Sequence, residues 1–145
     1  NAIGLFAEAS SFSNAFGTYS GANGSYSTAF GSSAQANGQF ALSVGKQSVA
    51  NSQSSIALGE EATVNNGATS INGIAIGKLA EVTASGGVAI GESVTAATAN
   101  TVTIKLLQIA NYASMSFADD TAAAAGGIPL GGVYHTSGAL KIRIA

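Results

Sequence analysis

The stretch that decides the fold is Gly73-Ile74-Ala75-Ile76-Gly77, which recurs fourteen residues later as Gly87-Val88-Ala89-Ile90-Gly91. Looser copies run through the first hundred residues, and the glycine that ends each copy stands at positions 4, 17, 31, 45, 59, 77 and 91. The spacings are 13, 14, 14, 14, 18 and 14 residues, and Val102-Thr103-Ile104-Lys105 closes the series after another 14 with lysine in place of glycine. A fixed period of this kind indicates stacked structural repeats.

A second segment follows each of these glycines. Small residues stand three and five positions later, as Ser20 and Ala22 do after Gly17. Two residues is the side-chain period of a strand, so each repeat predicts two short strands joined by two tight turns. At the turns, glycine supplies a backbone conformation that a residue with a Cβ would resist. The structural turn residues are therefore Gly17, Gly31, Gly45, Gly59, Gly77 and Gly91.

The strand before each glycine is apolar on both of its faces. Ile74 and Ile76 alternate with the small Ala75, and the other copies keep this order of large and small side chains. Stacked repeats bury a continuous core and pair their strands in parallel. We therefore expect a mainly β protein, a flattened parallel β-roll with a thin interior of small residues. The large aliphatic face needs a cover from outside the roll, and neighbouring chains around an axis are the simplest cover, which predicts a homotrimer.

The pattern resembles the head repeats of trimeric autotransporter adhesins, which form left-handed parallel β-rolls. The copies at Gly73–Gly77 and Gly87–Gly91 carry the resemblance most closely, and it covers roughly residues 1 to 105. The resemblance implies a left-handed β-roll or solenoid, a homotrimer, and adhesion to a host or matrix surface. It implies no defined binding site.

The repeat stops after Tyr112, so we expect a β-roll shaft over residues 1–110 and a small α+β cap over residues 111–145. Residues 115–118 predict a strand. Asp119 or Asp120 is expected to cap a short helix over residues 121–125, because aspartate accepts hydrogen bonds from the free N–H groups at a helix start. Residues 132–136 and 139–144 predict a hairpin around Ser137-Gly138. Its last strand alternates aliphatic and basic residues, which indicates one buried and one solvated face: Leu140, Ile142 and Ile144 against Lys141 and Arg143.

This ending resembles the terminal segment of many tailed-phage structural proteins. The resemblance is carried by Phe117-Ala118-Asp119-Asp120-Thr121, Gly131-Gly132-Val133-Tyr134-His135-Thr136 and Leu140-Lys141-Ile142-Arg143. It implies a phage fibre or virion appendage whose partners are other virion proteins and a host cell-surface receptor, with this segment as its distal or capping end. The alternative is a bacterial adhesin head, in which a coiled-coil stalk and a membrane anchor are expected after the roll.

Composition and motifs argue against several other functions. The net charge is −2 with no basic patch, which disfavours nucleic-acid binding, and the longest apolar run is too short for a membrane span. We expect no enzyme, cofactor or metal, because the chain has no cysteine and His135 has no neighbouring carboxylate in sequence. Helix capping explains Asp119-Asp120 better than a metal site does. An ice-binding solenoid would need a sustained threonine column, which the repeats lack.

Aromatic residues are the clearest candidates for a contact surface. Seven of the ten lie in the first 40 residues, and Phe12, Tyr26 and Phe40 stand fourteen apart, which predicts a stacked ladder. For the phenylalanines, core packing is favoured over exposure. Tyr19 and Tyr26 are better candidates for an exposed surface that contacts a receptor glycan.

The 18-residue spacing between Gly59 and Gly77 predicts one protruding loop over residues 65–70. A tolerated insertion is favoured over a binding loop. If the loop does contact a receptor, its candidate residues are Asn65, Asn66 and Thr69.

Overall fold

The computed structural model describes residues 1–65, 71–106 and 112–144. It divides into two units, Asn1–Leu106 and Leu107–Ala145, which are described in turn.

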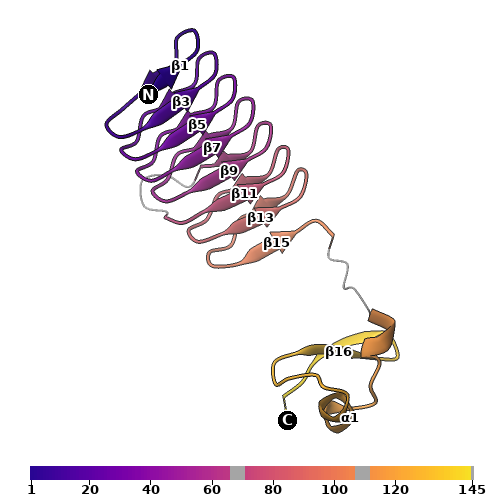
Figure 1. Cartoon of the computed structure of the whole chain (residues 1–145). Coiled ribbons are helices and arrows are strands. Elements are labelled where there is room, and N and C mark those ends of the chain that lie inside the picture. The colour runs from indigo at the N-terminus through magenta and orange to yellow at the C-terminus, as the bar shows by residue number, and fades with distance from the viewer. Residues whose placement is uncertain (66–70, 107–111, 145) are drawn as a thin grey trace. The chain divides into compact units, whose positions relative to one another are not determined.

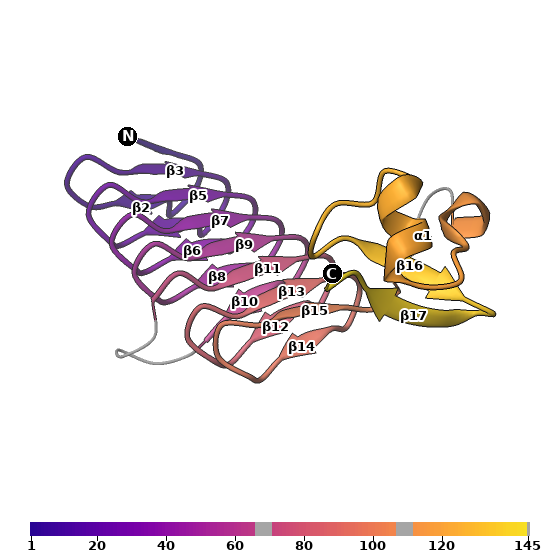
Figure 2. The ribbon, with the colours of Figure 1, turned by 90° about the horizontal axis from the view of Figure 1, so that it is seen from below.

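The first unit is a parallel β-roll with two strands in each coil (Figures 1 and 2). The first strands of successive coils pair to form one sheet, called here the first sheet: β1 Ala2–Ile3, β3 Asn14–Phe16, β5 Thr28–Phe30, β7 Leu42–Val44, β9 Ile56–Leu58, β11 Ile74–Ile76, β13 Val88–Ile90 and β15 Val102–Ile104. The remaining strands form the second sheet: β2 Glu8–Ala9, β4 Gly21–Ala22, β6 Gln35–Ala36, β8 Val49–Ala50, β10 Thr63–Val64, β12 Glu81–Val82 and β14 Thr95–Ala96. The predicted parallel roll of 14-residue repeats is confirmed.

The core is a thin layer of small side chains between the two sheets. Ala75 pairs with Ala57 on one side and Ala89 on the other, and all three are fully buried. The second sheet contributes a matching column that contains Ala22, Ala36, Ala50, Val64, Val82 and Ala96. Large side chains do not fit between sheets joined by such short turns, which is why alanine, serine and valine occupy the inward positions.

Two rows of turns join the sheets at opposite ends of their strands. The row that follows the first-sheet strands is called the first edge, and the row that precedes them is called the second edge. Gly45 at the first edge has a φ of 134°, and a Cβ on it would lie 2.3 Å from the carbonyl oxygen of Gly59. Glycine is thus required here both by its φ and by the close approach of the next coil.

The outer side of the first sheet is an apolar face. The face consists of the residues on either side of each inward residue, such as Ile74 and Ile76 around Ala75. Ile76 and Ile90 remain 38% and 37% exposed, and Phe30 remains 58% exposed. Within the described residues, this aliphatic column is therefore left open to solvent, as the two-faced strand pattern predicts.

The second unit combines short helices and a hairpin. It contains the 3-10 helix η1 Tyr112–Met115, the helix α1 Asp120–Ala125, and the antiparallel strands β16 Val133–Thr136 and β17 Ala139–Ile142. The side chain of Asp119 accepts a hydrogen bond from the backbone N–H of Ala122 at 2.8 Å, so the predicted helix cap is confirmed. The predicted hairpin around Ser137-Gly138 is also confirmed.

A tyrosine ties the hairpin of this unit to its helix. The hydroxyl of Tyr134 donates to Oδ1 of Asp120 at 2.5 Å, and the backbone N–H of Ile144 donates to Oδ2 of the same carboxylate at 2.8 Å. The hydrogen bond to Asp120, burial, and the negative charges of Asp120 and Asp119 together raise the pKa of Tyr134 to about 12.

Two expectations for this unit are wrong. Residues 115–118 do not form a strand: η1 ends at Met115, and only an isolated bridge joins Ser116 to His135. The last strand has no buried face, since all four residues of β17 are exposed. A unit of this size has too little material to cover both sides of a hairpin.

Candidate functional site

The first edge carries a stacked aromatic pair. Phe6 and Tyr19 occupy equivalent turn positions in successive coils, with ring centroids 5.0 Å apart and an interplanar angle of 19°. Both have a positive φ, near 55°, and both side chains are more than half exposed. The next residue in this column is Ser33, whose side chain is too small to cover a phenol ring. One face of the Tyr19 ring is therefore stacked, and no other aromatic ring of the described residues lies against the opposite face.

The second edge carries the predicted ladder of three rings, which is confirmed. Tyr26 stacks on Phe12 at 5.1 Å and 7°, and on Phe40 at 5.4 Å and 18°. Both faces of Tyr26 are thus occupied, and its edge and hydroxyl alone are open to a ligand. The two candidate tyrosines lie on opposite edges of the roll, so they do not form one surface.

The sequence favours core packing for the phenylalanines, and this prediction is wrong for the two phenylalanines of the ladder. Phe12 is 78% exposed and Phe40 is 51% exposed. The residue five before each repeat glycine lies in a turn of positive φ outside the two sheets, so its side chain cannot enter the alanine layer. The rings instead cover one another along the edge.

A shallow recess of about 360 Å³ opens beside the stacked pair of the first edge. It is called here the Gly21 recess, and it lies over the outer side of the second sheet between the first and third coils. Gly21 is the one position of that outer column, among the described coils, without a side chain, and it is buried beneath the side chain of Gln35. The recess is lined by Phe6, Glu8, Tyr19, Ser20, Gly21, Asn23 and Gln35.

Hydrogen bonds fix the polar groups of the Gly21 recess. Nε2 of Gln35 donates to the backbone carbonyl of Tyr19 at 3.1 Å, and Nδ2 of Asn23 donates to Oε1 of Gln35 at 3.2 Å. Glu8 forms no ion pair with another described residue, because the basic residues of the roll begin at Lys46. The recess therefore combines an aromatic ring, fixed amides and one free carboxylate.

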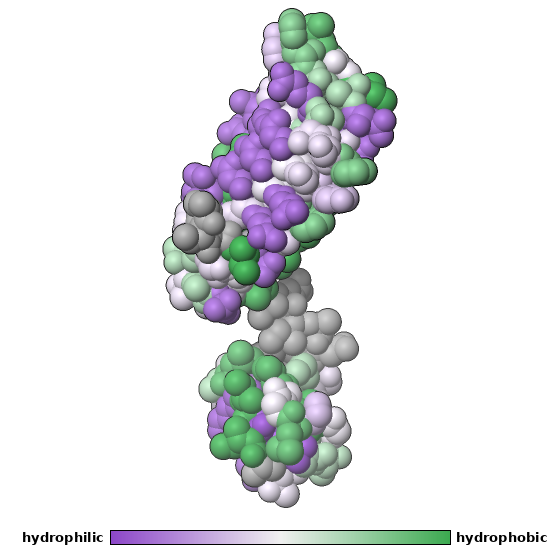
Figure 3. Space-filling model, turned by 90° about the vertical axis from the view of Figure 1, so that its left-hand side faces the viewer, coloured by the Kyte–Doolittle hydropathy of each residue, from purple (hydrophilic) through white to green (hydrophobic). Residues whose placement is uncertain are grey.

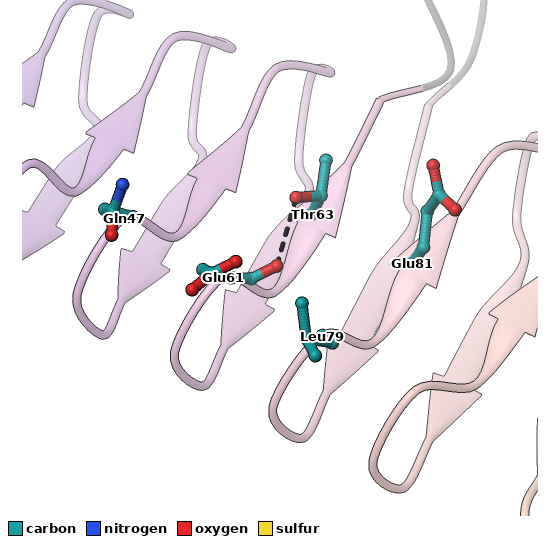
Figure 4. Close-up of a pocket in the computed structure, with 5 residues that line it drawn as sticks. All are labelled: Gln47, Glu61, Thr63, Leu79 and Glu81. Carbon is teal, nitrogen blue, oxygen red and sulfur yellow. Dashed lines mark hydrogen bonds between the residues drawn. The ribbon is translucent and has the colours of Figure 1, made fainter.

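A second hollow lies farther along the first edge (Figure 4). It is lined by the turn residues Gln47, Glu61 and Leu79 and by the outer strand residues Thr63 and Glu81. The hydroxyl of Thr63 donates to the backbone carbonyl of Glu61 at 3.3 Å. Two carboxylates without a cation or an aromatic ring are most simply solvated, so we do not treat this hollow as a site.

An exposed column of asparagines runs along the outer side of the second sheet. Nδ2 of Asn23 donates to Oδ1 of Asn37 at 2.7 Å, Asn37 donates to Asn51 at 2.7 Å, and Asn51 donates to Asn65 at 3.1 Å. Asn65, a candidate receptor contact, is therefore also the end of a structural ladder. The candidates Asn66 and Thr69 lie outside the described residues.

Outside the apolar face and the aromatic residues, much of the surface of the roll is polar with little net charge. In the view of Figure 3, hydrophilic residues gather over the middle of the roll, and hydrophobic residues lie at its N-terminal end and along one side. Charges alternate along one column of the first edge, where Glu60 pairs with Lys46 at 3.7 Å and with Lys78 at 3.4 Å. Exposed pairs of this kind contribute little stability, but they leave the edge nearly neutral.

The comparison with protein families agrees with this geometry. The family model of the YadA head domain repeat matches residues 12–34, 22–48, 36–62 and 68–91. Together these matches cover more than half of the chain. The chain belongs to the YadA head domain repeat family. Because such repeats build the heads of trimeric autotransporter adhesins, the chain is an adhesin-like head, and the resemblance drawn from Gly73–Gly77 is confirmed.

The YadA head repeats account for the roll and not for the second unit. The matched residues end at Gly91, and no comparison supports the phage resemblance of the C-terminal segment. A comparison with curated proteins finds no match.

Among the described residues, we find no group of catalytic side chains beyond those already considered from the sequence. Their His, Asp and Glu side chains form no cluster of three that could hold a metal ion. None of the described helices has the length and apolar character needed to cross a bilayer. His135 is buried in the hairpin, where its backbone carbonyl accepts from the N–H of Phe117 at 3.0 Å. The Gly21 recess is the feature that best fits a binding role.

Proposed function

We propose that this chain forms a homotrimer and serves as the exposed head of a fibre that attaches to a host surface. The observation that carries the proposal is the open apolar face of the first sheet. Its column of Ile76, Ile90 and Ile104 stays 37–40% exposed in a single chain. Apolar columns that run the length of a fold mark an interface, because leaving them in water forgoes the hydrophobic stabilisation that burial supplies.

A three-fold arrangement suits this face. Three rolls placed around an axis would bury the three apolar faces against one another, as family membership favours. The second sheet and the Gly21 recess would then face solvent on each protomer. A head built in this way offers three copies of any binding surface, and multivalent contact strengthens attachment without any new interaction.

For the structure that carries the head, we propose a phage virion, with a bacterial cell surface as the alternative. The C-terminal segment favours the virion through its resemblance to phage structural proteins. Membership of the YadA head family is compatible with the bacterial surface. Mass spectrometry of purified virions and of cell envelopes from the producing culture separates the two carriers. Recovery in the envelope alone would contradict the virion.

Attachment itself is tested with fluorescently labelled full-length protein on candidate host cells. The wild-type chain is expected to bind saturably. Ile76→Glu places a charge in the apolar face and should reduce attachment at least tenfold by converting the trimer to single heads. The control Thr95→Glu places the same charge on the exposed outer side of β14 and should bind like the wild type. Failure of the wild-type trimer to bind any tested cell type would contradict the proposed function.

A further inference from the structure

We propose that the Gly21 recess is a subsite for one uncharged pyranose residue of a host glycan. The inference rests on the proposed attachment function and names the chemistry of the contact. It is carried by the juxtaposition of a half-free aromatic ring, the Gln35 carboxamide that lies over Gly21, and further polar side chains in one recess.

The ring is Tyr19. Its first face stacks on Phe6 at 5.0 Å, and its second face has the small Ser33 as its neighbour in the next coil. The apolar C–H face of a pyranose can lie against a ring face that is open in this way. Tyr26 cannot offer the same contact, because Phe12 and Phe40 cover both of its faces. The two exposed tyrosines therefore differ in what they can bind, and this difference supplies an internal control.

The carboxamide of Gln35 can reach the backbone of Tyr19 because Gly21 has no side chain. A Cβ at this position would lie 2.5 Å from Oε1 of Gln35 and 3.1 Å from Nδ2 of Asn23. The same column carries Glu8 one coil earlier and Gln35 one coil later, and the carboxamide of Gln35 lies over Gly21, in the space that a side chain there would fill. A recess of about 360 Å³ accommodates one sugar ring.

The polar groups of the Gly21 recess can form hydrogen bonds with the hydroxyl groups of a sugar. Gln35 and Asn23 are held by their mutual hydrogen bond, so they need little ordering when a ligand arrives. The carboxylate of Glu8 accepts hydrogen bonds from hydroxyl groups and is not neutralised by any described basic residue nearby. Its negative charge disfavours acidic sugars, and we therefore assign the subsite to a sugar without a carboxylate.

The test uses the full-length trimer and a set of methyl glycosides, observed by saturation-transfer NMR and by shifts of backbone amide signals. The probes are the methyl glycosides of glucose, galactose, mannose and N-acetylglucosamine, with that of N-acetylneuraminic acid as the acidic comparison. At least one uncharged probe is expected to bind with a Kd of about 1 mM, the range of a single small contact. The acidic probe should bind at least about tenfold more weakly.

Substitutions separate this subsite from a general effect on the fold. Tyr19→Ala should weaken binding about tenfold or more, whereas Tyr26→Ala should change it less than about twofold, because of the two tyrosines only Tyr19 has an open ring face and lies in the recess. Gly21→Ala should weaken binding by displacing the end of Gln35. Glu8→Gln should retain the uncharged probe and improve binding of the acidic one, a change that altered folding would not produce. All variants are compared at equal trimer content.

Failure of every uncharged probe to bind, or equal binding by wild type and Tyr19→Ala, would overturn the subsite. Attachment to cells that survives periodate oxidation of their glycans would also overturn it while leaving the proposed function intact. Absence of attachment to any cell would instead count against the proposed function. In that case, binding of the methyl glycosides alone would test whether the recess is a sugar subsite.

Discussion

A Cβ atom placed on Gly17 would lie 2.4 Å from the carbonyl oxygen of Gly31 in the next coil. The same approach recurs from Gly31 to Gly45 at 2.5 Å and from Gly59 to Gly77 at 2.5 Å. The repeat glycine thus sets how closely the coils stack, in addition to permitting the turn. At the first edge, a side chain therefore cannot be accommodated at the positions of the repeat glycines. The last position of this column is Lys105, where the roll ends.

Replacing Gly31 by alanine should destabilise the roll strongly. The substitution forces a residue with a Cβ into a φ of 138° and against the backbone of Gly45, and we expect a loss of about 3 kcal/mol or more. Denaturant unfolding followed by circular dichroism, at a fixed protein concentration, measures the change. Ser32→Ala, at the exposed neighbouring position, should cost less than about 0.5 kcal/mol. Equal stability of the two variants would contradict the stacking role of Gly31.

At Tyr26, glycine should be better tolerated than alanine. Tyr26 adopts a φ of 60° and stacks on two rings, so alanine loses both ring contacts and keeps the strained backbone. Glycine loses the same contacts and relieves the strain, which is worth about 1 kcal/mol. Unfolding midpoints should therefore fall in the order wild type, Tyr26→Gly, Tyr26→Ala. An alanine variant more stable than the glycine variant would show that the positive φ carries no cost.

Each asparagine of the ladder should contribute to the stability of the roll in proportion to the number of side-chain hydrogen bonds that it makes. Asn37 accepts from Asn23 and donates to Asn51, whereas the side chain of Asn65, among the described residues, accepts from Asn51 alone. Because the ladder is exposed, Asn37→Ala should cost about 1 kcal/mol and Asn65→Ala about half of that. The exposed Gln39, outside the ladder, serves as the control on replacement by alanine. If the three substitutions lower the free energy of unfolding equally, the ladder does not contribute to stability.

The second unit should lose stability in strongly alkaline solution. Since the pKa of Tyr134 is raised to about 12, folding favours the protonated phenol, and this contribution is complete below the ordinary value of 10. Above that value the unfolded state releases the proton first, so stability falls as the pH rises through about 12. Ultraviolet difference absorbance should show one tyrosine ionising late. Tyr134→Phe should abolish that late transition, and its persistence in the variant would assign it to another tyrosine.

Much of the roll follows from the sequence because its period and its strand pattern act together. The alternation of Ala75 with Ile74 and Ile76 predicts an inward small column and an outward aliphatic one, and both are observed. The helix cap at Asp119 was predictable for a similar reason, since a local hydrogen bond decides it. Both features depend on neighbours in sequence or at one fixed spacing.

The aromatic residues and the Gly21 recess were harder to predict. Hydrophobicity alone places Phe12 inside, but its position in a turn of positive φ places it outside. The recess had a visible signal, because Gly21 interrupts a column of larger residues such as Glu8 and Gln35. That signal can be interpreted only when the strand register is known, because the register brings Phe6 and Tyr19 beside Gly21.

The most direct test of the central claim is the mass of the full chain in solution, measured by sedimentation equilibrium at low micromolar concentration. If the apolar face of the first sheet is covered by two further copies, the species will have a mass of about 42 kDa, three times the 14.1 kDa of the chain. Ile76→Glu should shift the mass toward a single chain, and Thr95→Glu should not. A stable folded wild-type species of 14.1 kDa would contradict the account.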